Sequence, residues 1–392
     1  MAKSVIKLKQ HTPMIHFQYY QEGVTLRATE LKPKLDKFLI KYAFKDCFDN
    51  YKYYLKGFNN KKCSIDDFKD HRALDYKVNI VNEGETSKDK PFKSLYFGNM
   101  GDKNENIQSI NVNGDINVEF ISFNKKLLDI INANIGSFFA VSNFGRRQNK
   151  GFGSFYIKNR KDCFKDVSDI YDVFWYINYN KTTSINDKLS NINIIYSLMK
   201  GGINFPKNKY NPKCYEKSFL FKYMLNKNVG NEKRFIKENF DLKTNKIVLD
   251  GMKKKYVRAM LGVAEKIDFR GNKEEPRDGT IEINSKIIER FKSPITFKII
   301  DNYLFILPED FAEEIYDKKF EFIEKDTKKE KENRNKKNIY TPSKNEFILN
   351  EFIAEFVSHF NQLKEKGHSH FDRTVKHTIL KYEKDKEGVI ND

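Results

Sequence analysis

The chain has 392 residues, and its 72 Lys and Arg residues outnumber 54 Asp and Glu residues, for a formal net charge of +18. With 39% hydrophobic residues and 34 Phe, it can bury a core and is not a disordered basic tail. The positive excess favours a polyanionic partner, because neutralising a phosphate releases condensed counterions. No apolar run approaches the ~20 residues that span a bilayer, and the start lacks an apolar signal segment. We therefore expect a soluble, cytoplasmic protein with no membrane contact.

The first half of the sequence alternates strand and helix patterns. Thr29 is the expected cap of the first helix, Pro33 is expected in its first turn, and the polar residues 59–90 are expected to form an insertion. Asn124 is the expected cap of the second helix. In chain order, we predict a strand at 4–9, a helix at 29–42, strands at 92–97 and 107–123, a helix at 124–138 and a strand at 151–157. This is the β-α-β-β-α-β order of a ferredoxin-like, RRM-type domain.

The second half repeats the theme loosely. Asp301-Asn302 is the expected turn of a hairpin, residues 324–337 are expected to form a solvated charged loop, and the tail beyond Gly367 is expected to fray. In chain order, we predict a strand at 171–178, helices at 184–199, 215–225 and 253–261, strands at 294–300 and 302–308, and a helix at 347–356. The expected fold class is α+β. Two ferredoxin-like (RRM-type) domains with helical insertions would occupy residues 1–160 and 161–392.

The most informative segment is SNFGRRQNKGFGSF, residues 142–155. Its glycines allow positive φ and a close approach of the backbone to a bulky ligand, and its cations can bind phosphate oxygens. It has neither the G-x-x-x-x-G-K-[ST] of a Walker A loop nor the helix-opening glycines of a Rossmann fingerprint. The pattern suits a loop that follows a sugar-phosphate backbone, and a plain glycine-rich turn with solvated charges is the alternative.

This helix, basic glycine-rich loop and strand beginning G-F-G resemble the signature loop of RAMP proteins, the RRM-fold subunits of CRISPR effector complexes. KLKQHTPMIHF (7–17) and TLRATELKPKLDKFL (25–39) are similar to the family's first strand and its R-A-T-E-[IL]-[KR]-G-x-L-R segment. YVRAMLGV (256–263) and ERFKSPITFKI (289–299) are weaker echoes of its R-x-x-G-[LV] and R-x-S-P elements. The sequence of these motifs is most similar to that of the first-numbered subunit of the type III-B, or Cmr, complex.

The sequence also departs from the family pattern. Pro33 replaces the family's glycine, residues 35–40 differ from its L-R-F-W-W-R continuation, and Ser142 and Asn143 stand where a double glycine is usual. Contacts with RNA from the first helix are therefore in more doubt than contacts from the glycine loop.

The resemblance implies a non-catalytic RNA-binding subunit of an antiviral ribonucleoprotein. It would contact the 3′ part of the crRNA and help to capture target RNA, with crRNA, target RNA and other subunits as partners and without a metal or cofactor. The residues expected to contact RNA are Arg27, Lys32 and Lys34 in the first helix, Gly145, Arg146, Arg147, Gln148, Lys150, Gly151 and Gly153 in the loop, and Arg258, Arg290 and Lys292 in the second half.

Other functions remain open. Some RAMP proteins are metal-independent endoribonucleases that process precursor crRNA with a histidine near the first helix, and His11 and His16 lie in a suitable loop. A generic basic RNA-binding protein fits the charge equally well. The histidines His359, His368, His370 and His377 lie in polar surroundings without a patterned carboxylate, so we expect no metal site there.

Overall fold

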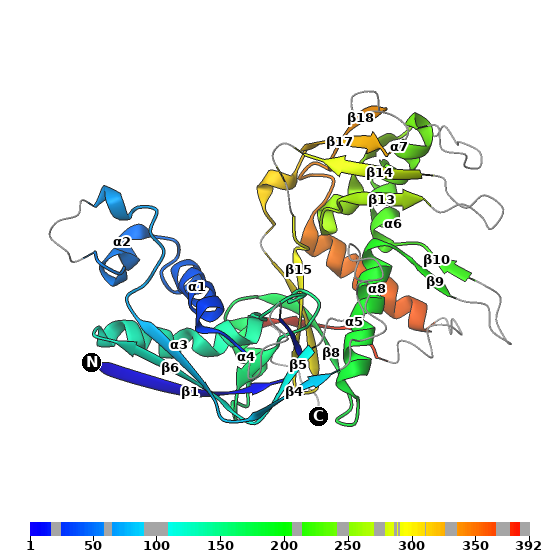
Figure 1. The fold of residues 1–392 in the computed structure, drawn as a ribbon. Helices are drawn as coiled ribbons and strands as arrows, with labels where there is room; N and C mark the ends of the chain where they lie inside the picture. The colour runs from blue at the N-terminus through cyan, green and yellow to red at the C-terminus, as the bar shows by residue number, and fades with distance from the viewer. Residues whose placement is uncertain are drawn as a thin grey trace. The chain divides into compact units, whose positions relative to one another are not determined.

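The computed structural model describes residues 1–16, 25–58, 65–89, 109–205, 214–240, 251–269, 279–285, 288, 291–309, 311–325, 335–365 and 377–384. Contacts divide the chain into two compact units (Figure 1). The first unit holds Met1–Ile192, Thr296–Leu307 and Leu380–Asp392, and the second holds Asn193–Ile295 and Pro308–Ile379. The boundary expected between residues 160 and 161 stays a prediction.

The first unit contains two four-stranded sheets, a small three-stranded sheet and the helices of the N-terminal half. Its elements are β1 (Ala2–Gln10), β2 (Met14–Ile15), α1 (Ala28–Phe38), the π-helix η1 (Leu39–Ala43), α2 (Phe48–Tyr51), the 3-10 helices η2 (Lys52–Tyr54) and η3 (Asp66–Phe68), β3 (Lys77–Asn82), β4 (Glu85–Asp89), β5 (Ser109–Asn113), β6 (Ile116–Ser122), α3 (Lys125–Val141), β7 (Phe155–Ile157), α4 (Cys163–Ser168), β8 (Val173–Asn178), the first half of α5 (Ile185–Lys200), nearly all of β15 (Ile295–Ile300) and β16 (Tyr303–Pro308), and β19 (Leu380–Glu383).

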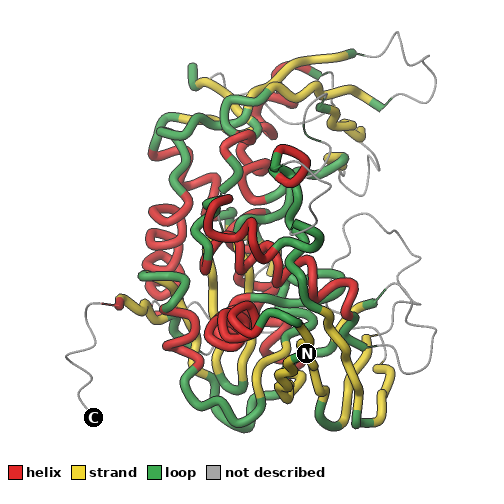
Figure 2. The backbone as a smooth tube through the Cα atoms, turned by 90° about the vertical axis from the view of Figure 1, so that its left-hand side faces the viewer, coloured by secondary structure: helices red, strands yellow, loops and turns green. Residues whose placement is uncertain are grey.

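The first sheet has the strand order β3-β6-β1-β7 and is antiparallel throughout. Counted in chain order the strands lie 2-3-1-4, the arrangement that a β-α-β-β-α-β unit forms when its two halves interleave. In Figure 1 α1 and α3 lie on the same side of β1 and β6, and Figure 2 shows the strands side by side near the N-terminus. Leu8, Val118 and Phe120 are buried under these helices, which explains the alternation along each strand.

The second sheet repeats this plan. Its order is β15-β16-β8-β19, again 2-3-1-4 when counted along the chain. The elements follow as β8, α5, β15, β16, α8 (Leu349–Glu365) and β19, with an insertion between α5 and β15. The expected α+β class and the two ferredoxin-like repeats are therefore confirmed. The two sheets share one core within the first unit, since buried Phe174 and Phe305 join the cluster around Phe120.

Several local predictions need correction. The N-cap of α1 is Arg27, not Thr29, and Pro33 lies in the second turn, not the first. The segment 59–90, expected to be an insertion, contains β3, which pairs with β6 over six residues, while the strand expected at 92–97 lies outside the described residues. The polar tail holds β19, which pairs with β8. By contrast, Asn124 caps α3 as expected, because its side chain accepts a hydrogen bond from the Leu127 N–H at 3.2 Å.

The second unit contains the remaining sheets. Its elements, besides the rest of α5 and α8, are β9 (Ile203–Phe205), β10 (Cys214–Glu216), α6 (Phe219–Asn226), β11 (Val229–Asn231), α7 (Glu232–Asn239), β12 (Lys253–Lys255), the 3-10 helix η5 (Val257–Leu261), β13 (Lys266–Phe269), β14 (Gly279–Asn284), the 3-10 helix η6 (Glu313–Ile315), β17 (Lys319–Glu324) and β18 (Lys336–Tyr340). The predicted helices at 215–225 and 253–261 thus each begin with a short strand. The connection expected at 324–337 spans fewer residues than predicted, because β17 extends to Glu324 and β18 begins at Lys336.

Strand β15 forms one edge of the second sheet, and the glycine-rich segment covers that edge. The Phe297 N–H donates to the Asn149 carbonyl at 3.3 Å, and Asn143 Nδ2 donates to the Phe297 carbonyl at 2.8 Å. Ser154 Oγ donates to the Ile299 carbonyl at 2.5 Å. The segment therefore satisfies backbone groups that an open edge would leave unpaired.

Asn143→Ala should destabilise the first unit. Asn143 is buried and also donates to the Gln148 carbonyl at 2.7 Å, so alanine leaves two carbonyls without this donor. An unsatisfied buried polar group costs about 1–3 kcal/mol, and we expect the free energy of unfolding to fall by about 2–4 kcal/mol. Trp175, the chain's single Trp, is buried in β8 and can report urea unfolding by fluorescence. The exposed Asn79→Ala is the matched control, and equal midpoints for the two variants would contradict this role.

Candidate nucleic-acid interface

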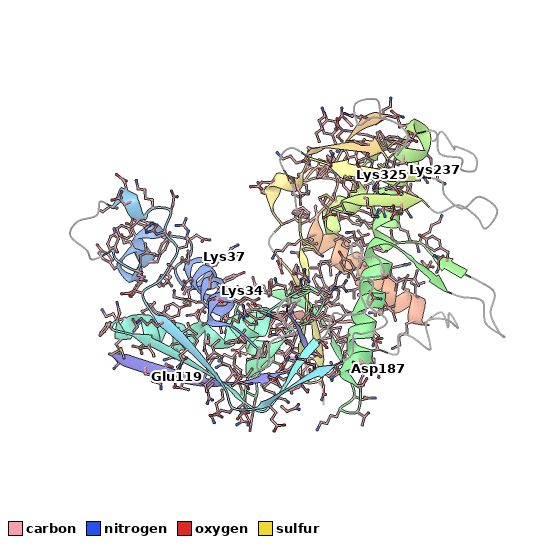
Figure 3. All side chains as sticks on the ribbon, in the orientation of Figure 1. Lys34, Lys37, Glu119, Asp187, Lys237 and Lys325 are labelled. Carbon is pink, nitrogen blue, oxygen red and sulfur yellow. The ribbon has the colours of Figure 1, made fainter. Side chains whose placement is uncertain are left out.

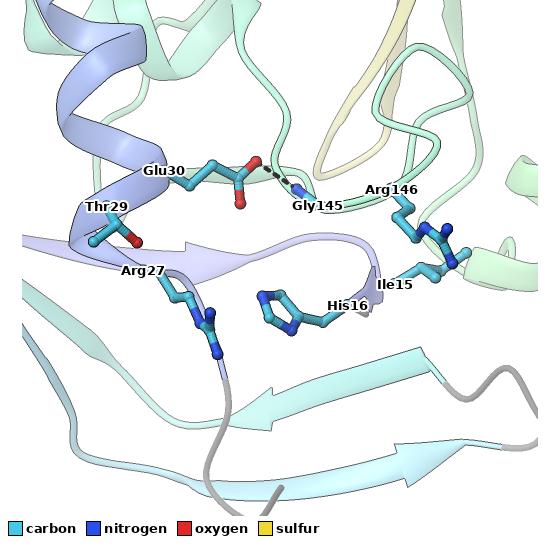
Figure 4. Close-up of a pocket in the computed structure, with 7 residues that line it drawn as sticks. All are labelled: Ile15, His16, Arg27, Thr29, Glu30, Gly145 and Arg146. Carbon is cyan, nitrogen blue, oxygen red and sulfur yellow. Dashed lines mark hydrogen bonds between the residues drawn. The ribbon is translucent and has the colours of Figure 1, made fainter. Parts of the chain in front are cut away.

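A pocket of about 400 Å³ opens where β2, the start of α1 and the glycine loop meet (Figure 4). A volume of this size lies in the range typical of small-molecule sites. The residues that line it are Ile15, His16, Arg27, Thr29, Glu30, Gly145 and Arg146. The structure thus brings together three residues expected to contact RNA, Arg27 from one segment and Gly145 and Arg146 from another. It adds one histidine of the alternative enzyme function, His16.

Helix α1 and the glycine loop are joined at the pocket by a carboxylate. Glu30 Oε1 accepts a hydrogen bond from the Gly145 N–H at 2.8 Å and from Lys34 Nζ at 3.1 Å. On the other side, the Arg146 N–H donates to the Ile15 carbonyl at 2.8 Å. The loop is therefore held between α1 and β2, and the pocket is formed before any ligand arrives.

Thr29 lines the pocket at the start of α1. Its hydroxyl can both donate and accept a hydrogen bond. The pocket therefore combines two guanidinium groups with a hydroxyl and the carboxylate of Glu30. Donors suit phosphate oxygens, while acceptors suit hydroxyl or amino groups.

The surroundings of the pocket histidine favour its neutral form. Burial is the largest cause that lowers the pKa of His16, the charge of Arg27 lowers it further, and Glu30 partly opposes both. The His16 ring points toward Arg27 in Figure 4. A neutral imidazole can stack or exchange hydrogen bonds with a ligand without adding charge.

The two lysines expected to contact RNA from α1 have internal partners. Lys34 Nζ donates to the Asn143 carbonyl at 2.8 Å and to Gln148 Oε1 at 2.6 Å, so Lys34 and Gln148 brace the loop. Lys32 Nζ donates to Asp36 at 2.7 Å and to the Leu74 carbonyl at 2.9 Å, beside the Tyr76 ring. Neither side chain lines the pocket.

The loop glycines are required by packing within the chain. Gly145, Gly151 and Gly153 all have positive φ, at 81°, 81° and 67°. A Cβ at Gly153 would lie 1.8 Å from the Phe144 carbonyl oxygen, and one at Gly145 would lie 2.7 Å from the Ile15 carbonyl oxygen. At Gly151 it would meet the Ile192 side chain at 2.6 Å. The sequence suggested that these glycines let RNA approach the backbone closely. In the structure they let the loop pack closely against other residues of the same chain.

The loop cations differ in exposure. Arg146 is exposed, but Arg147 is half-buried with φ of 58°, and burial, followed by the charge of Arg146, lowers its pKa to about 10. Arg147, which was also expected to contact RNA, is therefore less accessible than Arg146. The Lys150 backbone bridges to Phe297 of β15, and its side chain is half-buried. Arg146 is the loop cation best placed to meet a ligand.

The residues expected in the second half belong to the second unit. Arg258 donates from Nε to the buried Glu232 carboxylate, and the exposed Lys292 pairs with Glu309. Arg290 lies outside the described residues.

Sequence reasoning missed two cations that continue from the pocket along the first helix. Lys37 is exposed on α1 (Figure 3), and Lys41 follows in η1 with its Nζ 4.6 Å from the Tyr42 ring. Lys34, Lys37 and Lys41 recur at three and four residues, which places them on one face of a helix. This charge spacing was the signal that could have identified them.

His11 occupies a structural position. Its Nδ1 accepts a hydrogen bond from the Asp301 N–H at 3.0 Å, so the ring is a neutral Nε2–H tautomer in this contact. Burial lowers the pKa of His11 to about 3, although Asp301 opposes the shift. A ring that is neutral and tied to the β15–β16 turn is poorly suited to act as a general acid.

The described residues include no group of three or more His, Cys, Asp or Glu that could hold a metal ion. His359 stacks on Phe219, with ring centroids 5.1 Å apart, while His368 and His370 fall outside the described ranges. Among the helices that the structure describes, none is long and apolar enough to cross a membrane.

Two models of one protein family match most of the chain. A family model described as the Cmr1 N-terminal domain matches residues 1–203, and one described as the Cmr1 C-terminal domain matches residues 215–379. Among solved structures, the chain is similar to apo Cmr1 from Pyrococcus furiosus, with 12% identity over 81% of this chain and 92% of that chain, and a TM-score of 0.41. No curated protein matches the sequence.

The buried His11 predicts a pH-dependent stability. Because the folded-state pKa of about 3 lies below the ordinary 6.5, only the unfolded chain binds this proton between these values, and stability falls as the pH falls through them. Wild type should lose about 2 kcal/mol more than His11→Gln between pH 7 and pH 5. Urea unfolding followed through Trp175 measures this difference. His71→Gln, at an exposed position, is the control, and parallel pH profiles for wild type and His11→Gln would contradict the assignment.

Proposed function

Because this chain belongs to the Cmr1 family, and is a RAMP-type subunit of a type III-B CRISPR complex, we propose that it binds RNA there without cleaving it. Its RNA would be the 3′ part of the crRNA and the target that pairs with it, in antiviral defence. The single observation that carries this proposal is the pocket between α1 and the glycine loop, which Arg27 and Arg146 flank.

The chemistry of the pocket favours a nucleotide over a simple anion. Guanidinium groups fork onto phosphate oxygens, which suits Arg27 and Arg146 to a phosphodiester. The carboxylate of Glu30 would repel a phosphate but can accept hydrogen bonds from ribose hydroxyls or base amino groups, and the Thr29 hydroxyl can accept them as well. The 2′-hydroxyl, which separates RNA from DNA, is a donor of this kind. This combination supports RNA as the ligand.

The surroundings of the pocket extend the same surface. Lys37 and Lys41 lie one and two turns along the helix from Lys34 and offer further ammonium groups to a strand that leaves the pocket. Because single-stranded RNA carries one phosphate per nucleotide, a row of lysines can follow it without reading its sequence.

Arg27→Ala combined with Arg146→Ala should weaken binding of single-stranded RNA more than tenfold. Each charge-assisted bond contributes about 1.5–3 kcal/mol, and 1.4 kcal/mol corresponds to a factor of ten. The slope of log affinity against log salt should fall by about 1.4, near 0.7 per lost phosphate contact. Fluorescence anisotropy of a labelled RNA with the full chain measures both quantities.

The control for net charge is Lys125→Ala combined with Lys126→Ala. These exposed lysines lie at the start of α3, whereas the glycine loop follows its end. The control should change affinity less than threefold. Equal losses in the two double variants would show that total charge, and not the pocket, governs binding.

The second candidate function is metal-independent RNA cleavage, and the observation that favours it is His16 in the same pocket as Glu30. We propose that the purified chain does not cleave RNA, because His11 is tied to the Asp301 backbone and His16 lacks a second histidine in the pocket lining. Incubation of precursor crRNA with the protein in EDTA should leave the RNA intact. Cleavage that disappears in His16→Ala would establish the enzyme instead.

A further inference from the structure

Three cations of the second unit converge where the end of α5, the start of α7 and η5 meet. They are Lys200, the last residue of α5, Lys233 in the first turn of α7, and Arg258 in η5. Arg258 lies close to both lysines, since its positive charge helps to lower the pKa of Lys200 and the pKa of Lys233. The cluster is separate from the pocket of the first unit, and only Arg258 among its members was expected from the sequence to contact RNA.

Hydrogen bonds hold two of these cations, Lys200 and Arg258, in place. Lys200 Nζ donates to the Leu261 carbonyl at 3.1 Å and to the Gly262 carbonyl at 2.6 Å. Arg258 donates from Nε to Glu232, whose Oε2 also accepts from the Val257 N–H at 3.0 Å. The neighbouring Leu261 carbonyl also accepts from Tyr196 Oη at 2.6 Å, which fixes the end of η5. The Lys200 ammonium is therefore positioned by backbone carbonyls, and the Arg258 guanidinium by the carboxylate of Glu232.

Lys233 lies near more cationic than carboxylate groups, since the charges of Arg258 and Lys237 oppose that of Glu232 there. Glu232 is the carboxylate that acts on both lysines, and Lys237 adds further positive charge near Lys233. Burial, then Arg258, lowers the pKa of Lys200 to about 7, against the opposing effect of Glu232. The buried Nη2 of Arg258 has no hydrogen-bond partner within the described ranges. Cations that are kept close together despite burial and mutual repulsion commonly mark a site for an anion.

The backbone beside the cluster is exposed at Gly201, which follows Lys200, and a Cβ there would meet nothing nearer than the Ser197 carbonyl oxygen at 3.9 Å. Tyr215 is exposed on β10, and its Oη donates to the Gly201 carbonyl at 3.2 Å, so an aromatic side chain lies next to the residue that follows Lys200. Basic groups next to an exposed aromatic ring suit a phosphate and its attached base.

We propose that Lys200, Lys233 and Arg258 bind a phosphate group of RNA at a second site in the second unit, a proposal that rests on the RNA-binding function proposed above. The oxyanion would accept hydrogen bonds from the ammonium groups and from the guanidinium edge not used by Glu232. It would also relieve the repulsion among the three cations and favour the charged form of Lys200.

Competitive labelling of the full chain tests the oxyanion chemistry without RNA. Lysines react with trace acetic anhydride only as free amines, so reactivity followed by mass spectrometry from about pH 6 to pH 10 reports each titration. Sulfate, which does not titrate in this range, is compared with chloride at equal ionic strength. We expect sulfate to lower the reactivity of Lys200 at pH 8 at least tenfold, and Lys233→Met to remove most of that effect. Lys319, exposed on β17, should react equally in both salts.

Anisotropy with single-stranded RNA then identifies the ligand. Lys200→Met should weaken RNA binding about tenfold, and Lys319→Met should not change it. A Lys200 titration that is identical in sulfate and chloride would overturn the site. Protection by sulfate combined with unchanged RNA affinity in Lys200→Met would overturn RNA as its ligand. If wild type binds no RNA while sulfate still protects Lys200, the function proposed above fails and the oxyanion chemistry of the cluster stands.

Discussion

The edge of β15 is the constraint on which the first unit depends. A ferredoxin-like repeat places its second strand at an edge, and in the second repeat that strand, β15, is buried along its length. Buried backbone groups must find partners, and the glycine-rich segment supplies them through Asn143, Asn149 and Ser154. Lys298 of the same strand is fully buried and donates to the Ser142 and Phe155 carbonyls at 2.7 and 2.9 Å. These contacts join the glycine-rich segment of the first repeat to β15 of the second repeat.

This constraint explains why a loop with a proposed binding function can be rigid. One side of the segment forms hydrogen bonds with backbone groups of β15. The other side, through Gly145 and Arg146, forms the wall of the pocket with α1 and β2. A loop that is already ordered loses little conformational freedom when a ligand binds. The tight positions of Gly145 and Gly153 therefore serve binding indirectly, by fixing where the exposed Arg146 begins.

The sequence predicted what is local and missed what depends on distant partners. The Asn124 cap and the β15–β16 hairpin follow from short patterns, and both are present. Strands β3 and β19 were missed because they lie in segments rich in polar and charged residues, and their pairing with β6 and β8 gives no local signal. In the site, residue type identified Arg27 and Arg146, but it could not show that Lys32 and Lys34 have internal partners. Nor could it bring Lys200 and Lys233 to Arg258, since burial and charge coupling arise only after folding.

The distribution of cations decides how the net charge of +18 should be understood. Lys255 is buried between Asp317 and Glu346, Lys298 is buried among carbonyls, and burial lowers the pKa of Lys298 well below its ordinary value. Such buried lysines are counted in the net charge but cannot contact a polyanion. Under the proposed function, affinity for RNA depends on the few cations that folding leaves both positioned and accessible, such as Arg146 and Lys37. Because counterion release counts contacted phosphates and not total charge, its salt dependence measures that smaller set directly.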